Sequence, residues 1–111
     1  MRYLFLICVE PGTTVTPEQA NPGPWVDEMT ERKVRVLGDR LRPDSDATTV
    51  RVRDAELLVS DGPFVETREL VGGFDVIDCA DLDEAIEVAS KHPMAWAGMI
   101  ELRPFWPDNE D

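Results

Sequence analysis

Basic residues are scarce in this chain of 111 residues, which has 11 Lys and Arg against 23 Asp and Glu and a net charge of −12. A nucleic-acid binder needs a basic surface to displace counterions, so we expect no nucleic-acid partner, and no docking on anionic membranes. No apolar run approaches the roughly eighteen residues that span a bilayer. The composition predicts one soluble, cytoplasmic domain over residues 1–106, followed by an acidic tail over residues 107–111.

Histidine and cysteine are also scarce, with one and two residues respectively. The single histidine, His92, gives no basis for a Ser–His–Asp triad. Cys8 and Cys79 lack the C-x-x-C spacing and the additional ligands that a metal or redox site requires. Gly72-Gly73 belongs to neither a G-x-G-x-x-G nor a Walker pattern, so it does not predict a phosphate loop. We therefore expect no metal and no organic cofactor.

The apolar pattern predicts five strands and two helices. In the first helix acidic residues precede basic ones, with i,i+4 pairs Glu28–Arg32 and Glu31–Arg35, and Gly38 is a plausible stop. The second helix begins with Asp81 as N-cap, places His92 in its last turn and ends at Pro93. The predicted strands are Tyr3–Val9, Thr48–Arg53, Glu56–Ser60, Phe74–Cys79 and Gly98–Pro104, and the first helix is Pro24–Leu37.

The order strand, helix, hairpin, strand, helix, strand predicts an α+β chain, a ferredoxin-like split βαβ sandwich with an extra β-hairpin. Two helices on one face leave the other face of a four-stranded sheet bare, so we expect a second copy to cover it and enclose a pocket. We also expect the first and third core strands to be adjacent and parallel. The thiols of Cys8 and Cys79 would then be near neighbours.

The stretch from Val59 to Gly73, VSDGPFVETRELVGG, closely resembles the signature of the DGPF-domain proteins, which belong with the YCII-related superfamily. Segments around it agree in order, namely Thr48–Val52, Leu82–Ala85, His92-Pro93 and Ile100–Pro104. The resemblance implies a ferredoxin-like chain that pairs into a dimeric α+β barrel. It implies no settled reaction.

This sequence departs from the pattern of related proteins at two places. YCII-type proteins have a His–Asp pair proposed as a catalytic dyad, with the histidine in the first helix. The histidine of this chain, His92, is instead at the end of the second predicted helix, so the dyad does not carry over. Similar proteins often have an aromatic residue at the position of Asp75.

The signature supplies most of the candidate site residues. Asp61 can accept a proton, Phe64 can form a pocket wall, and Arg68 can bind a carboxylate or phosphate beside Glu66 and Glu69. The alternative is an Asx-turn at Asp61 followed by exposed, partly compensating charges.

His92 has two interpretations as well. It can act as a general acid or base, or it can be a structural cation that the dipole of the second helix stabilises.

Two functions follow from these candidates. The first is a homodimeric small-molecule-binding protein, with a pocket near the DGPF loop, that acts as a cofactor-free acid–base enzyme with Asp61 and His92 as catalytic residues. The second is a non-enzymatic interaction module. Genes of related proteins often adjoin those of extracytoplasmic-function sigma factors, which by association implies a regulatory role in transcription.

Overall fold

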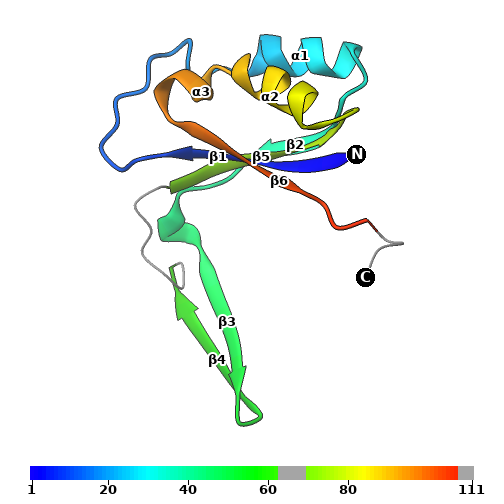
Figure 1. Cartoon of the computed structure of the whole chain (residues 1–111). Coiled ribbons are helices and arrows are strands. Elements are labelled where there is room, and N and C mark those ends of the chain that lie inside the picture. The colour runs from blue at the N-terminus through cyan, green and yellow to red at the C-terminus, as the bar shows by residue number, and fades with distance from the viewer. Residues whose placement is uncertain (63–69, 108–111) are drawn as a thin grey trace.

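The computed structural model describes residues 1–62 and 70–107. It has a four-stranded sheet, helices on one face of that sheet, and a separate β-hairpin on the opposite side (Figure 1). The sheet contains β1 (Arg2–Val9), β2 (Arg35–Arg40), β5 (Leu70–Asp78) and β6 (Met99–Pro104). The helices are α1 (Gly23–Glu31), α2 (Leu82–Ser90) and α3 (Met94–Ala97), and a 3₁₀ turn, η1 (Asp44–Asp46), precedes the hairpin of β3 (Thr48–Arg53) and β4 (Glu56–Asp61).

The strand order β2-β5-β1-β6 is consistent with the predicted ferredoxin-like class. All three neighbouring pairs are antiparallel, so the expected parallel pairing of the first and third core strands is wrong. In the register of β1 with β5, Cys8 lies opposite Val71, whereas the backbone N–H of Cys79 donates to the carbonyl of Met1 at 2.9 Å. The two buried thiols therefore lie at opposite ends of this strand pair, and they are not neighbours.

The first helix is shorter than predicted, because it ends at Glu31 in a Schellman motif. Lys33 adopts the left-handed conformation with φ 62°. The N–H of Lys33 donates to Thr30 O at 3.0 Å and the N–H of Val34 to Met29 O at 3.1 Å, which satisfies the last carbonyls. Met29 and Val34 are both in the core cluster, so the hydrophobic contact typical of this motif is present.

The residues after this turn form the edge strand β2, which the sequence analysis assigned to the helix. Arg35 is thereby removed from Glu31 and pairs with Asp75 of β5 instead, so the predicted Glu31–Arg35 pair is wrong. The Glu28–Arg32 contact does form, at 3.8 Å. Gly38 is not a helix stop but a strand residue opposite Asp75.

The second helix largely follows the prediction. Asp81 is its N-cap and accepts a hydrogen bond from Glu84 N at 2.9 Å, while the Glu84 side chain accepts from Ala80 N at 2.8 Å. The helix ends at Ser90, so His92 lies beyond it. Pro93 stops α2 and begins the short helix α3, which the sequence did not predict.

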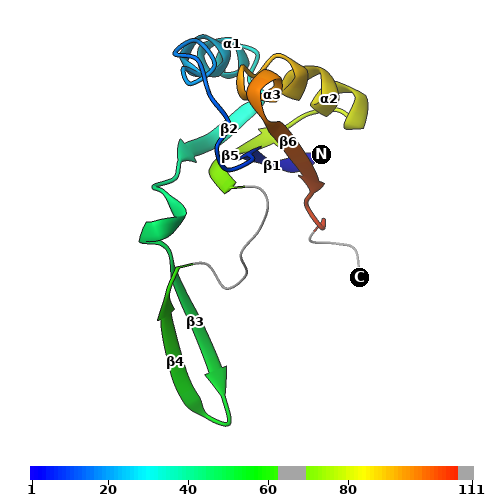
Figure 2. The same ribbon diagram turned by 90° about the vertical axis from the view of Figure 1, so that its left-hand side faces the viewer.

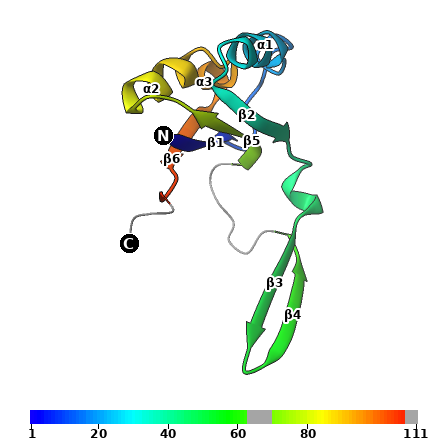
Figure 3. The ribbon, with the colours of Figure 1, turned by 90° about the vertical axis from the view of Figure 1, so that its right-hand side faces the viewer.

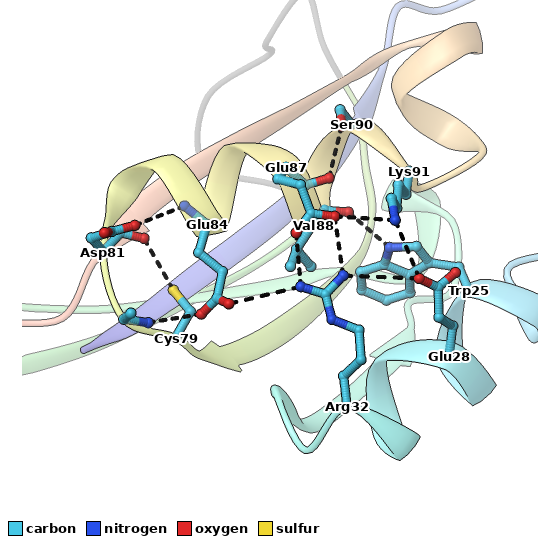
Figure 4. A network of polar contacts seen from close by, with 11 residues as sticks. Trp25, Glu28, Arg32, Cys79, Asp81, Glu84, Glu87, Val88, Ser90 and Lys91 are labelled. Carbon is cyan, nitrogen blue, oxygen red and sulfur yellow. Dashed lines mark hydrogen bonds and ion pairs between the residues drawn. The ribbon is translucent and has the colours of Figure 1, made fainter.

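Arg32, the residue that caps the C-terminus of α1, links the two long helices (Figure 4). Arg32 donates from both terminal nitrogens to the two carboxylate oxygens of Glu87, at 3.0 and 2.7 Å. Lys91 lies 3.2 Å from the same carboxylate. The hydrogen bond from Arg32, with that from Lys91, lowers the pKa of Glu87 to about 2. Below this network, the largest fully buried side chains are Phe5, Met29, Ile77 and Val88.

The hairpin pairs only with itself in the described sheet assignments. Its two-residue loop, Asp54-Ala55, has φ 52° and 63°, which are the signs of a type I′ turn. The Cα radius of gyration is 16.0 Å, larger than the roughly 13 Å of a compact domain of this length. The projection of the hairpin away from the sheet, seen again in Figure 2 and Figure 3, accounts for this extended shape.

Candidate functional site

A cavity of about 450 Å³ lies where the helix-side face of the sheet meets the loop before α1 and the start of α3. Apolar side chains such as Ile7, Val26 and Met94 form much of its wall. Its charged and titratable lining residues are Arg35, Asp39, Arg40, Asp75 and His92. A mostly apolar cavity with a few convergent polar groups is the usual form of a small-molecule site.

Asp75 and Arg35 form a largely buried ion pair in this wall. Arg35 Nε donates to Asp75 Oδ1 at 2.8 Å, and the two side chains are 18% and 8% exposed. Burial raises the pKa of Asp75 above 3.8, although its hydrogen bond and charge interaction with Arg35 act in the opposite direction. A carboxyl in a cavity whose pKa burial raises is a candidate for a general base.

Gly38 makes room for this carboxylate. A Cβ built on Gly38 would collide with Asp75 Oδ1 and with the carbonyl of Phe74. The residue opposite Asp75 in the neighbouring strand therefore cannot carry a side chain while Asp75 keeps its position. A glycine at this edge-strand position is therefore compatible both with the buried carboxylate and with the close approach of the Phe74 carbonyl.

Arg35 keeps hydrogen-bonding capacity toward the cavity. Its contact with Asp75 uses Nε, and none of the hydrogen bonds among the described residues uses Nη1 or Nη2. A guanidinium with two parallel donors is the group that binds a carboxylate in a bidentate manner. Arg40, two registers along β2 from Gly38, lines the same cavity and adds a second positive charge, beside Asp39.

His92 contributes a neutral ring. It is 3% exposed, and its ring meets the ring of Trp25 edge-on with 4.6 Å between the centroids. Burial lowers its pKa from 6.5 to about 4. Nδ1 accepts a hydrogen bond from Met94 N at 3.0 Å, so in the neutral ring the proton is on Nε2. The expectation of a dipole-stabilised cation in a last helical turn is therefore wrong, because His92 lies beyond α2 and desolvation favours its neutral form.

The structure separates the two predicted catalytic residues. His92 lines the cavity, whereas Asp61 is exposed at the end of β4 and is not among the lining residues. The next residue, Gly62, has φ 86°, and its carbonyl accepts from Thr49 Oγ1 at 2.7 Å. The four predicted ligand-binding residues, Phe64, Glu66, Arg68 and Glu69, lie outside the described residues.

The sequence analysis missed Arg35, Gly38 and Asp75 as members of one site. Arg35 and Gly38 were assigned to a helix and its stop, which placed them far from any strand. The alternation of Val34 and Val36 with charged residues was the available signal for a strand. Asp75 stands between Phe74 and Val76 in an otherwise apolar run, where a single acid indicates a buried polar group.

Comparisons with known proteins agree with the resemblance described above. The model of the YCII-related domain matches residues 1–108. An uncharacterised protein of Rhizobium meliloti (strain 1021) is 46% identical over 67 residues, which cover 59% of this chain and 54% of the relative. The match thus spans about half the length of that curated relative. Among the described residues, no helix has the length and apolar character to cross a membrane, and no group of three or more His, Cys, Asp or Glu is arranged to hold a metal.

Proposed function

This chain belongs to the YCII-related family, and we propose that it is a homodimeric protein that binds a small organic anion in the cavity and moves a proton on it. The single observation that carries this proposal is the buried Arg35–Asp75 pair facing a mostly apolar cavity. A buried ion pair is weak evidence for stability, because desolvation opposes the attraction between its charges. A binding or catalytic role explains why the pair occurs in this cavity.

The roles follow from the geometry. Arg35 holds the carboxylate of the ligand with Nη1 and Nη2, while the apolar wall covers the rest of the molecule. Asp75 accepts a proton from the ligand and returns it to another atom of the same ligand, so the net reaction needs no oxidant and no co-reactant. His92, with its proton on Nε2, is a hydrogen-bond donor rather than a base. This proposal transfers the role of general base from Asp61, where the sequence placed it, to Asp75.

The homodimer part of the proposal is based on the face of the sheet opposite the helices, here called the open face, whose apolar side chains are half-buried in the single chain. In the register of β1 with β5 and β6, Leu4 and Leu6 alternate with the core residues Phe5 and Ile7, so they point away from the helices. Phe74 lies opposite Leu6 and is therefore on the same face. A second copy that covers these side chains, sheet against sheet, gives the dimeric α+β barrel.

A non-enzymatic interaction module is the second candidate. The observation that favours it is the exposed apolar side of the β3–β4 hairpin, where Val50, Val52, Leu57 and Val59 are each more than half exposed. Such a surface is typical of a protein that binds another protein. In that case the cavity would bind no ligand and the Arg35–Asp75 pair would be structural.

Binding is tested with benzoate and phenylpyruvate, which combine a carboxylate with an apolar body. We expect calorimetry to detect binding to the wild type and to Asp61→Ala, and binding about tenfold weaker or more to Arg35→Gln, because the variant lacks the charged fork. The matched variant Asp75→Asn keeps the size of the side chain and binds the anion at least as well. Absence of binding to the wild type, or equal binding to Arg35→Gln, contradicts the proposed site.

Proton transfer is tested separately, by following exchange of the enolisable C–H of phenylpyruvate in D₂O by NMR. The wild type should accelerate exchange over buffer, and Asp75→Asn should lose about a hundredfold of that acceleration, as expected for loss of a general base. If Asp61→Ala loses the acceleration while Asp75→Asn keeps it, the base is Asp61 and the assignment made here is wrong.

A further inference from the structure

One side of the β3–β4 hairpin carries four aliphatic residues, Val50, Val52, Leu57 and Val59, which we call the hairpin face; Thr48 and Asp61 follow on the same side at the base of the hairpin. Val50 lies directly opposite Val59, and Val52 opposite Leu57, so the four side chains form two adjacent cross-strand pairs on one side. Their exposed fractions are 61%, 58%, 64% and 60%. The other side carries mainly polar residues, Thr49, Arg51, Arg53, Glu56 and Ser60, together with Leu58 opposite Arg51.

Within the part of the chain that the structure describes, the hairpin has little support outside its own two strands. It is a two-stranded sheet of its own, and it extends away from the four-stranded sheet in all three views (Figures 1–3). An isolated two-stranded hairpin is only marginally stable in water and needs a further layer to pack on. Contacts at its base, such as Gly62 N donating to Ala47 O at 2.7 Å, fix its origin but leave the hairpin face open.

We propose that the hairpin face of each chain packs onto a second copy of this chain, as an arm that clasps the partner. The inference rests on the proposed homodimer, because the arm leaves the molecule on the same side of the sheet as the open face of Leu4, Leu6 and Phe74. A copy that covers this open face is therefore within reach of the arm. In a two-fold dimer the same contact forms twice, so the hairpin face of each chain is buried against the other chain.

Charge argues for a second copy rather than for a partner of another kind. The chain has a net charge of −12, and a cationic partner would be selected by acidic side chains. The four residues of the hairpin face carry no charge, and on this side of the paired strands the only acid is Asp61 at the base. An association of two like-charged chains requires contact patches without charge, and the hairpin face is such a patch. Leu37, Leu41 and Val71, which belong to or follow strands of the sheet, are further exposed aliphatic residues.

Apolar contact between two copies of the chain and charge attraction to a cationic partner respond to salt in opposite ways. Between copies that each carry −12, added NaCl screens the repulsion, so a dimer held by apolar arms becomes tighter as salt increases. A complex with a cationic partner would become weaker instead. Salt dependence thus distinguishes the proposed occupant from the alternative.

The test is sedimentation of the wild type over a range of concentrations at low and high NaCl, beside two variants. Val50→Thr/Val59→Thr keeps the shape and strand propensity of one cross-strand pair but removes methyl groups from the hairpin face. Leu58→Thr is the matched control, because Leu58 is adjacent to Val59 but points to the other side. We expect the double variant to weaken dimerisation at least about tenfold, the control to weaken it less than about threefold, and hydrogen exchange of the hairpin to slow as the dimer forms.

Each of the following outcomes contradicts the proposal that the hairpin packs onto a second copy. If the wild type dimerises and the double variant dimerises equally well, the arm is wrong while the homodimer stands. If the control weakens the dimer as much as the double variant, the effect is not specific to the hairpin face. If the wild type is a monomer at all concentrations, both the arm and the proposed homodimer are wrong, and anion binding in the cavity is still decided by calorimetry.

Discussion

The buried neutral state of His92 predicts how the stability of the protein depends on pH. Its pKa is 6.5 when exposed and about 4 in the folded chain, so the folded state binds fewer protons than the unfolded state between these values. The contribution of His92 to stability is therefore fully present above pH 6.5 and is lost as pH falls toward 4. The complete difference corresponds to about 3 kcal/mol, of which about 2 kcal/mol is lost between pH 7 and pH 5.

The assay compares urea unfolding of the wild type and His92→Asn at pH 7 and pH 5. Asparagine does not titrate, and its Oδ1 can accept the Met94 N–H that Nδ1 of His92 accepts in the wild type. The other charged groups of the cavity, Arg35, Arg40, Asp39 and Asp75, are present in both proteins, so the comparison isolates the effect of His92. We expect the wild type to lose about 2 kcal/mol more free energy of unfolding than the variant over this interval.

Two results would refute this reasoning. The first is an equal loss of stability in both proteins, which would show that His92 has similar pKa values in the folded and unfolded states. The second is a directly measured NMR titration of His92 with a midpoint near 6.5 in the folded chain. Either result would also remove the argument that His92 is a donor and not a base in the cavity.

Four further outcomes are expected. Gly38→Ala should lower the free energy of unfolding by about 2 kcal/mol in urea, and by less in an Asp75→Gly background, because the new Cβ meets the carboxylate. Arg35→Met/Asp75→Leu should raise the free energy of unfolding by about 1–3 kcal/mol at pH 7 and should abolish benzoate binding. A lower free energy of unfolding would show that the ion pair is net stabilising. Lys33→Gly should raise the free energy of unfolding by about 1 kcal/mol, because residue 33 has a left-handed φ of 62° that glycine adopts without strain. An unchanged melting temperature would argue against backbone strain at this position. Ala55→Gly should slow hydrogen exchange of the hairpin amides about fivefold, because φ is 63°; equal exchange would contradict the type I′ strain.

The sequence predicted the elements whose signals are local. The apolar run of β1, the alternation of β3 and β6, and the N-cap Asp81 are each recognisable within a few residues, and the structure contains all of them. The end of the first helix was missed because the left-handed residue of its Schellman motif is Lys33, where a glycine would have marked the stop. That error removed β2 from the predicted sheet.

The candidate site was harder to predict because it depends on that missing strand. Arg35 meets Asp75 only when β2 pairs with β5, and no local pattern connects residues forty positions apart. Predictions based on the signature concentrated on Asp61 and the residues after it. The structure shows instead that Gly72 and Gly73, at the end of the same signature, line the cavity that contains Asp75.

The strongest reason to place the chemistry at Asp75 is that folding does not require an acid there. Burial raises the pKa of this carboxyl, which means that its charged form costs stability in the folded chain. Opposite it in the neighbouring strand is Gly38, where a Cβ would meet both this carboxylate and the backbone carbonyl of Phe74. A buried acid that costs stability, in the wall of a cavity that also contains Arg35, is what the proposed binding and proton transfer would account for.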